Sequence, residues 1–362
     1  MSILVYNGGM EFSEESRNGE PVSVNLALEL LDAVKKEMAK RIVGQGEMID
    51  GLLTGLISGG HVLLEGVPGL AKTRAVKTLA KITGLAFKRI QFTPDLLPAD
   101  LTGTLVWEQA TGSFSVRRGP VFANVILADE INRAPAKVQS ALLEAMEERQ
   151  VTIGEKSYPL PSPFFVLATQ NPIEHEGTYA LPEAELDRFL LKLLVRYPDQ
   201  EEEKSILGFA EPFYSGGAET KTEDLKQVLA ERELELIRKA ADSVFIDEKI
   251  SGYIVSVVAA SRPASSRPVP GAGESRPGIG RPREGLFRYI AFGGSPRASL
   301  ALYRCSRIRA LLEGRTFVTP EDVKAAAYPV MRHRLVLSYE AEADGLEADS
   351  VISRILALVP IP

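Results

Sequence analysis

The chain has 362 residues, of which 45% are hydrophobic and 25% are charged, as in an ordinary globular protein with one large domain or two. Its net charge of −6 gives no global attraction to nucleic acid or anionic membranes, although it does not exclude a local basic groove. The single cysteine, Cys305, excludes an internal disulfide and favours a reducing compartment. With no signal-peptide pattern and no apolar run approaching about 18 residues, we expect a cytoplasmic protein without a membrane span.

Helical and strand patterns alternate along the N-terminal part of the chain. Residues 1–22 are expected to form a flexible tail. Apolar residues recur at helical spacing from Leu26 to Met38, and a second helix should follow Gly44 and Gly46. The stretch "HVLLEG" indicates a short buried strand, and "KTRAVKTLAKITG" indicates a helix that Gly84 closes.

Two further apolar runs, "NVILADE" and "FFVLATQNP", are predicted to be buried strands. The helix "PAKVQSALLEAMEERQ" lies between them, with Pro135 near its start. Strands that alternate with helices predict a parallel sheet with helices on both faces. Two β-hairpins, at residues 104–118 and around residues 151–160, are expected to protrude from this α/β pattern.

The chain changes character near residue 200. From there to the end we expect helices and find no further strand pattern. Residues 261–285 are dense in Pro, Gly, Ser and Arg, a composition that cannot build a packed core, so they are predicted to form a mobile loop. Alternatively, the arginines of this insert could bind an acidic partner or nucleic acid.

The stretch "GVPGLAKT", residues 66–73, lies between a predicted strand and a predicted helix, where a phosphate-binding loop belongs. Backbone N–H groups and the helix N-terminus attract phosphates, Lys72 can reach the β and γ phosphates, and the Thr73 hydroxyl can coordinate Mg²⁺. Ala71 stands where the general pattern has glycine. We expect alanine to impair the loop only if the position needs a positive φ or a very close backbone approach. Taken alone, the motif could equally be an ordinary strand–helix turn.

Polar side chains follow the two later strands. Asp129 fits a second Mg²⁺ contact, and Glu130 fits the base that activates the attacking water. Gln170 and Asn171 end the other strand, where an amide could hold that water or sense the γ phosphate. Alone, Asp129 and Glu130 would more often be two solvated acids at a strand end, but the preceding phosphate loop favours the catalytic interpretation. Gln170 and Asn171 could also form an ordinary turn before Pro172.

Arg188 in "AELDRFL" and Arg297 in "GGSPRAS" would each be read as surface charges if taken alone. In this order, however, "GVPGLAKT", "LADEINRAP", "ATQNP", "LDRF" and "GSPRA" together resemble the MoxR-type AAA+ ATPases over about residues 25–340. Alanine at the sixth position of the loop is the form common in that family, so Ala71 departs only from the general pattern.

The resemblance implies an α/β fold, namely an AAA+ P-loop NTPase core in which helices flank a parallel sheet with β-hairpin inserts. An all-α lid domain follows this core. The core would span residues 23–197, a linker residues 198–220, and the lid residues 221–362, with the mobile insert inside the lid.

The resemblance also implies a homo-oligomeric ring, usually a hexamer, with ATP bound between neighbours. Arg188 matches the arginine finger that reaches the next subunit's γ phosphate, Arg297 matches sensor 2 of the lid, and Asn171 matches sensor 1. The expected catalytic residues are therefore Glu130, Asn171, Arg188 and Arg297. The expected ATP contacts are Val43 and Gly44 on the adenine, Gly66, Val67, Pro68, Gly69, Leu70, Ala71, Lys72 and Thr73 in the loop, and Asp129, with Thr73 and Asp129 as the Mg²⁺ ligands.

The function that the resemblance implies is an ATP-driven, chaperone-like motor that remodels a partner protein. That partner is often a von Willebrand factor A domain protein, and the outcome is assembly or the insertion of a metal or cofactor. Trp107, Phe114 and Arg117 are candidates for touching the client, although Trp107 could simply pack within its own hairpin. The alternatives are a magnesium-chelatase-like motor subunit, a nucleic-acid translocase, which the acidic pI disfavours, or a nucleotide-gated scaffold that scarcely hydrolyses ATP.

Two residue types that often carry chemistry are expected to be structural here. His61 precedes a buried strand, and the three histidines lack the spacing of metal ligands. Cys305 lies on an apolar helix face, where core packing is the more common role.

Overall fold

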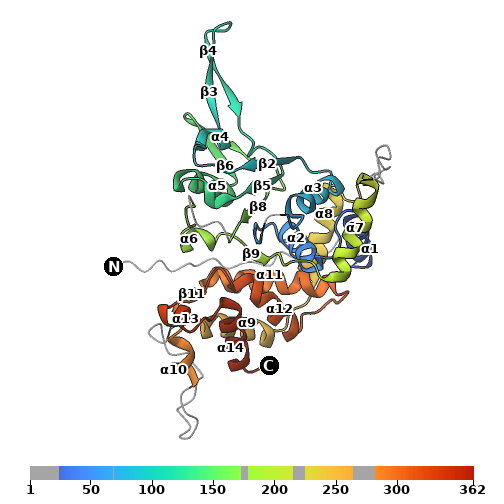
Figure 1. The fold of residues 1–362 in the computed structure, drawn as a ribbon, viewed down its shortest axis with the longest axis vertical. Coiled ribbons are helices and arrows are strands. Elements are labelled where there is room, and N and C mark those ends of the chain that lie inside the picture. Colours follow the sequence, from blue (N-terminus) through green and yellow to red (C-terminus); the bar gives the residue numbers. More distant parts are fainter. Residues whose placement is uncertain (1–23, 68, 173–177, 215–224, 264–281) are drawn as a thin grey trace, which may run out of the picture.

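A computed structural model describes residues 24–67, 69–172, 178–214, 225–263 and 282–362 (Figure 1). The predicted tail at residues 1–22, Pro68 of the phosphate loop and most of the predicted insert at 261–285 lie outside these residues.

A sheet of five parallel strands forms the centre of the first half of the chain, in the order β2-β5-β8-β1-β9. The three central strands, β5 (Val125–Asp129), β8 (Phe165–Gln170) and β1 (Val62–Glu65), are the apolar runs predicted as strands. The edge strands β2 (Phe87–Gln91) and β9 (Leu191–Leu194) were not predicted. Strand β2 is mostly exposed and carries Lys and Arg, so it lacks the continuous apolar run that marks a central strand.

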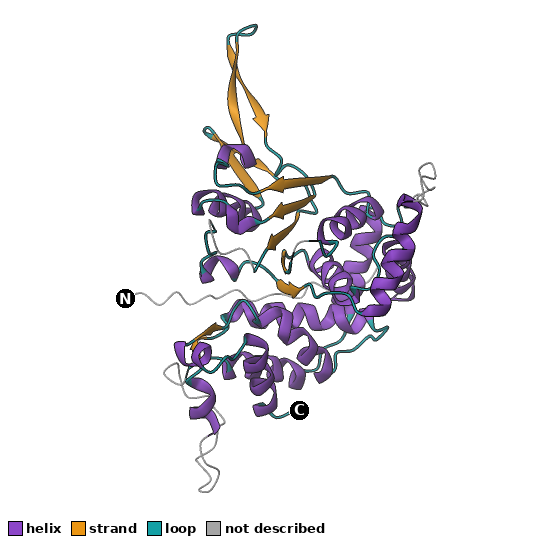
Figure 2. Cartoon of the chain, in the orientation of Figure 1, coloured by secondary structure: helices purple, strands orange, loops and turns teal. Residues whose placement is uncertain are grey.

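Helices cover both faces of this sheet, as the alternating pattern predicts (Figure 2). One face packs against α1 (Val24–Ala39), α2 (Gly46–Ser58) and α3 (Lys72–Ile82). The other face packs against α4 (Pro98–Thr102) and α5 (Ala136–Glu148). Successive residues of each central strand belong to the two core clusters in turn, because side chains alternate across a strand.

Both predicted hairpins are present. Strands β3 (Gly103–Glu108) and β4 (Ser113–Arg118) form a long antiparallel ribbon that projects from the top of the molecule in Figure 1. Strands β6 (Gln150–Ile153) and β7 (Lys156–Pro159) form the second, shorter one.

The second half of the chain is a helical lid, as expected. Its longer helices are α8 (Glu231–Ser243), α9 (Glu248–Ala260), α11 (Pro296–Leu312), α12 (Pro320–Met331) and α14 (Ala348–Leu358), and its shorter ones are α10 (Pro282–Phe287) and α13 (Tyr339–Ala343). The expectation of no further strand is wrong in one detail, because β10 (Ile290–Phe292) pairs with β11 (Val336–Leu337). Strands of three and two residues are too short to show a period-two pattern.

Helices also occupy parts of the ranges predicted as linker and insert. Within residues 198–220, α7 (Gln200–Tyr214) follows Asp199, whose Oδ1 accepts hydrogen bonds from the N–H groups of Glu201 and Glu202. This N-terminal cap and the acidic first turn both favour a helix. Helix α10 begins within residues 261–285, and Ser261 is fully buried.

The lid packs directly on the core. Helix α11 contacts α2, helix α12 contacts β9, and a single apolar cluster runs from one face of the sheet into the lid. The short α6 (Glu183–Leu186) leads into β9 at this junction. Among the described residues, no helix has the length and apolar character needed to cross a bilayer.

Candidate nucleotide-binding and catalytic site

The predicted phosphate loop connects the carboxyl end of β1 to the N-terminus of α3. The Lys72 ammonium folds back onto the loop and donates a hydrogen bond to the Gly66 carbonyl at 2.5 Å. The first N–H groups of the 11-residue helix α3 and its dipole make this end attractive to an anion. The loop therefore presents a lysine and a helix N-terminus at one place, as phosphate binding requires.

Ala71 adopts a left-handed backbone conformation at the start of α3, with φ 56° and ψ 14°. The condition under which we expected alanine to be unfavourable, a positive φ, is therefore met. Gly69 also has a positive φ, 89°, which glycine adopts without strain. The alanine costs the loop some backbone strain, yet the chain still closes the turn into α3.

Acidic side chains from neighbouring strand ends face Lys72. Burial lowers the pKa of Lys72 from its usual value, while the nearby charges of Asp129, Glu130 and Glu65 act in the opposite direction. Glu65 itself pairs with Lys192, with 2.7 Å between Nζ and Oε2. The carboxyl ends of parallel strands thus bring the loop lysine, the predicted Mg²⁺ ligand Asp129 and the predicted base Glu130 to the same edge of the sheet.

Asp129, the last residue of β5, is held from both neighbouring strands. Arg89 of β2 donates to Oδ2 from Nε at 2.9 Å and from Nη2 at 2.6 Å. Thr169 of β8 donates its hydroxyl to Oδ1 at 2.7 Å. A cation bound by Asp129 would share this carboxylate with Arg89 or displace it.

Glu130 follows with a left-handed backbone, φ 57° and ψ 51°, and its N–H donates to the Thr169 hydroxyl at 2.8 Å. Gln91, the last residue of β2, donates its amide to Glu130 Oε2 at 2.7 Å. Arg133, at the end of the short helix η2 (Ile131–Arg133), donates to the same oxygen at 3.0 Å. Gln91 and Arg133 thus both donate to Oε2 of Glu130, and neither donates to Oε1, where the carboxylate could accept a proton from water.

The predicted sensor 1 residue, Asn171, and the residues predicted to contact the adenine lie around the same edge. Asn171 comes directly after β8, whose Gln170 carbonyl accepts from the Gly66 N–H at 3.3 Å, and Asn171 is 7% exposed. Next to Val43 and Gly44, Gln45 donates to the Arg196 carbonyl at 2.9 Å, and a Cβ on Gly66 would lie 2.7 Å from the Val195 carbonyl. Two consecutive residues directly after β9 thus contact the predicted adenine segment and the phosphate loop.

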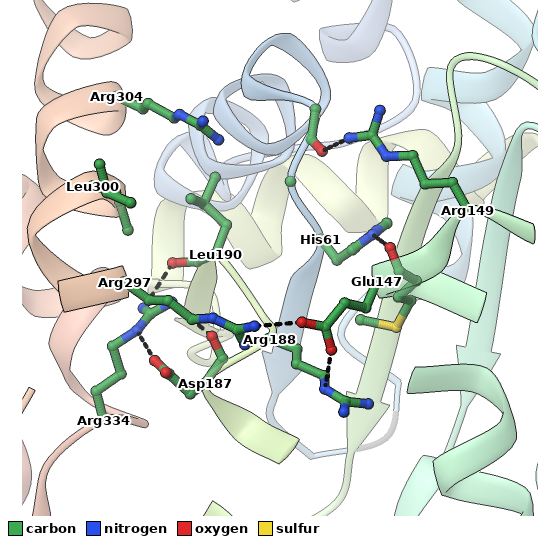
Figure 3. A pocket seen from close by; sticks show the side chains of 14 residues that line it. His61, Glu147, Arg149, Asp187, Arg188, Leu190, Arg297, Leu300, Arg304 and Arg334 are labelled. Atoms are coloured by element: carbon green, nitrogen blue, oxygen red, sulfur yellow. Dashed lines mark hydrogen bonds and ion pairs between the residues drawn. The ribbon is translucent and has the colours of Figure 1, made fainter. Parts of the chain in front are cut away.

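Arg188 and Arg297 lie at the opposite edge of the sheet, where the parallel strands begin. Both line a pocket that also includes His61, Leu190 and Gly60, residues that precede β1 and β9 (Figure 3). Strand β1 has four residues, so it separates this pocket from the loop by roughly 13 Å of backbone. The structure therefore places the two predicted arginines together, but not beside the nucleotide site of their own chain.

Several residues of the site escaped sequence reasoning. Arg89 and Gln91 lie on β2, which the sequence did not mark as a strand, and Thr169 lies inside β8. The polar ending of "FKRIQ" is the one signal that could have identified Gln91, because a strand there would place it at the edge that holds Asp129.

His61 and Cys305 are structural, as expected. Burial lowers the pKa of His61 to about 4, and its Nδ1 accepts from the Val166 N–H at 3.0 Å while Nε2 lies 3.3 Å from the Met146 carbonyl. Burial raises the pKa of the Cys305 thiol to about 12. Among the described residues, no three His, Cys, Asp or Glu side chains gather as metal ligands, so a cation at Thr73 and Asp129 would take its remaining ligands from phosphate and water.

The strand order, the loop between β1 and α3, and the acidic end of β5 define a P-loop ATPase of the AAA+ class. Residues 61–191 match the family described as the ATPase family associated with various cellular activities (AAA), and residues 288–355 match the AAA lid domain.

Related proteins cover nearly the whole chain. It is 47% identical over 326 residues to "Chaperone MoxR1" of Mycobacterium tuberculosis, and the aligned region covers 90% of this chain and 81% of that protein. It is 33% identical over 336 residues to "Protein MoxR" of Methylorubrum extorquens, covering 91% and 94%. A crystal structure of an ATPase candidate from Cytophaga hutchinsonii superposes with a TM-score of 0.79 at 44% identity, covering 93% of this chain and 97% of that one. The chain belongs to the MoxR family of AAA+ ATPases and has the general role of an ATPase chaperone.

Proposed function

We propose that this chain hydrolyses ATP at the interface between two copies of itself in a closed ring, which we expect to be a hexamer. The observation that carries the proposal is the position of Arg188 and Arg297 at the edge of the sheet opposite Lys72. In a head-to-tail ring, the arginine edge of one copy meets the loop edge of the next. Such an arrangement would supply the arginine finger that a phosphoryl transfer site needs.

The remaining groups of the site fit Mg²⁺ and a triphosphate. Thr73 and Asp129 offer the hydroxyl and carboxylate oxygens that Mg²⁺ prefers, and the bound ion would neutralise charge on the β and γ phosphates. Lys72 would leave the Gly66 carbonyl for the phosphates. Glu130 would take a proton, on the oxygen to which neither Gln91 nor Arg133 donates, from the water that attacks the γ phosphorus as the bond to the β-phosphate oxygen breaks.

Two substitutions test this function. Glu130→Gln should bind ATP with the affinity of the parent and fail to turn it over, because the amide cannot accept the proton. Arg188→Ala should abolish steady-state hydrolysis while ATP binding persists, because the finger contributes ~10³–10⁵ in rate. Turnover by Glu130→Gln at the parental rate, or full activity of a monomer in sedimentation experiments, would refute the proposal.

We further propose that the cycle remodels a client protein, and that the β3–β4 hairpin touches it. Trp107 and Phe114 are paired across this hairpin with ring centroids 5.0 Å apart, yet they remain 53% and 64% exposed. Packing within the hairpin and client contact are therefore compatible. Arg117 lies on the same ribbon, opposite Thr104.

The client class we propose is a von Willebrand factor A domain protein, with assembly or metal or cofactor insertion as the outcome, and family membership supports this. The Glu130→Gln variant, which should bind ATP without hydrolysing it, should retain the bound client. Adding Trp107→Ala and Phe114→Ala to this variant should weaken its binding to the client. Tyr339→Ala is the matched control, because Tyr339 is 90% exposed but lies on the lid. Equal capture by the hairpin variant and the control would refute the role of the hairpin.

A further inference from the structure

The two predicted catalytic arginines, Arg188 and Arg297, come from different domains and meet on one carboxylate. Arg188 lies just before β9 in the core, and Arg297 lies in the first turn of α11 in the lid. Arg188 Nε pairs with Glu147 Oε2 at 3.0 Å, and Arg297 Nη2 pairs with Glu147 Oε1 (Figure 3). Each carboxylate oxygen of Glu147 thus pairs with one guanidinium.

This pairing leaves both arginines able to bind a further anion. A guanidinium carries five N–H donors, and Arg188 contributes only Nε to Glu147, while Arg297 contributes one Nη group. The side chains of Arg188, Glu147 and Arg297 are 29%, 38% and 49% exposed, so the cluster is open to solvent. Two positive charges around one negative charge leave a net positive site with unused donors.

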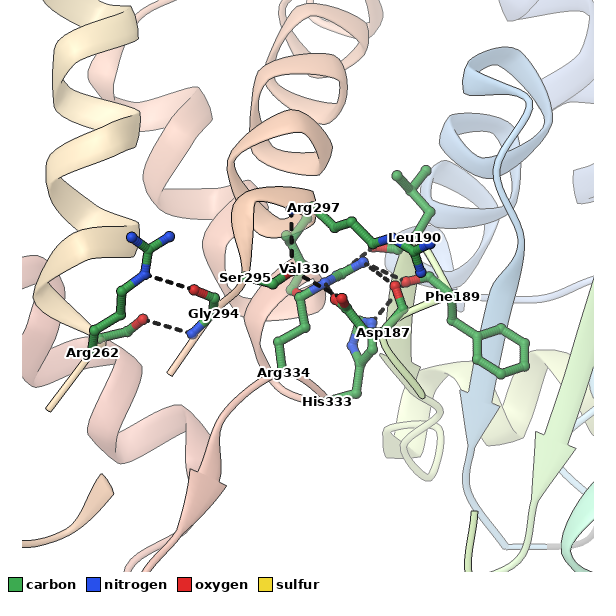
Figure 4. A network of polar contacts seen from close by, with 11 residues as sticks. Asp187, Phe189, Leu190, Arg262, Gly294, Ser295, Arg297, Val330, His333 and Arg334 are labelled. Carbon is green, nitrogen blue, oxygen red and sulfur yellow. Dashed lines mark hydrogen bonds and ion pairs between the residues drawn. The ribbon is translucent and has the colours of Figure 1, made fainter. Parts of the chain in front are cut away.

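The backbone segments that carry the two arginines are also linked. Asp187, the residue before Arg188, accepts from Arg334 Nε at 2.7 Å and from the Ser295 hydroxyl at 2.9 Å (Figure 4). Ser295 caps α11 and accepts from the Arg297 N–H at 3.1 Å. Asp187 therefore ties the backbone segments of core and lid together, and Glu147 ties the guanidinium ends of the same two arginines.

We propose that Glu147 is a positioning residue for hydrolysis, which holds Arg188 and Arg297 in one geometry for the terminal phosphate of the ATP in the adjacent copy. This inference rests on the proposed function. Without the carboxylate, two like charges repel and each long side chain samples other rotamers. An amide at this position offers one acceptor and turns its NH₂ donor toward a guanidinium, so it cannot hold both arginines.

The decisive variant is Glu147→Gln, with Glu148→Gln as its matched control. Glu148 is the next residue of α5, is exposed, and has no ion pair or side-chain hydrogen bond among the described residues. We expect Glu147→Gln to lower kcat about tenfold, because misplaced catalytic groups lose rate steeply, while Kd for ATP and the melting temperature stay unchanged. Glu148→Gln should stay within about twofold of the parent.

Mixed rings separate positioning across the interface from an effect within one copy. Glu130→Gln subunits carry an intact arginine edge, and Glu147→Gln subunits carry an intact nucleotide edge. A mixture of the two should hydrolyse ATP faster than the sum of the separate proteins, because some interfaces join two intact edges. A mixture of Glu130→Gln with Arg188→Ala shows whether subunits exchange and whether the arginine edge acts across the interface.

Three results would overturn the inference. Glu147→Gln could turn over ATP at the parental rate, or faster, which would make Glu147 a brake. Alternatively, its mixture could equal the sum while the Arg188→Ala mixture complements, which would place the effect of Glu147 within its own copy. If the Arg188→Ala mixture also fails to complement, the proposed function fails and the inference falls with it.

Discussion

Replacing Ala71 by glycine should stabilise the protein. Alanine at φ 56° and ψ 14° is in the left-handed region, which costs an L-residue ~1–2 kcal/mol. Glycine avoids that cost but loses ~0.5–1 kcal/mol through its greater freedom in the unfolded chain. The net expectation for Ala71→Gly is a gain of about 0.5–1 kcal/mol in the free energy of unfolding. Ala71→Val should lose at least ~1 kcal/mol, because a β-branched residue tolerates a positive φ poorly.

Urea denaturation of the parent, Ala71→Gly and Ala71→Val, followed by circular dichroism, measures the order of their free energies of unfolding. Ala75→Gly provides the opposite control, since Ala75 is buried in the interior of α3, where glycine costs ~1 kcal/mol. A lower denaturation midpoint for Ala71→Gly, or a parental midpoint for Ala71→Val, would refute the strain argument. We expect the turnover of Ala71→Gly to stay within tenfold of the parent. A rise of tenfold or more, about 1.4 kcal/mol, would show that the alanine impairs the loop itself.

Three further predictions concern the buried polar groups. Asp187→Asn leaves Arg334, whose side chain is 3% exposed, without its ion partner, and should cost ~3 kcal/mol in thermal unfolding of the lid–core unit. The folded-state pKa of His61 is lowered to about 4, so the unfolded chain binds an extra proton between pH 6.5 and 4. Stability should therefore fall by about 3 kcal/mol as the pH drops through that window, and His61→Gln should flatten the slope in denaturant titrations. Cys305, buried and with a pKa raised to about 12, should resist a thiol reagent at pH 8 and react promptly in urea; fast labelling of the folded protein would contradict its core assignment.

The sequence by itself determined the local parts of this protein. The loop at 66–73, the acidic end of β5 and the apolar central strands each lie within a few consecutive residues, so composition and order suffice to predict them. Parallel strands then imply that Lys72, Asp129 and Asn171 share one edge, because all carboxyl ends point the same way.

The tertiary structure alone decided the rest. The edge strands β2 and β9 are short or polar, so only pairing with their neighbours reveals them, and with β2 come the partners that hold Asp129 and Glu130. The positive φ of Ala71 depends on how the loop closes onto α3, since the residue type does not favour it. Arg297 of the lid reaches Glu147 across 150 residues of sequence and joins Arg188 there, a contact made by docking the lid on the core. No local pattern encodes such a contact, because it depends on how whole elements pack.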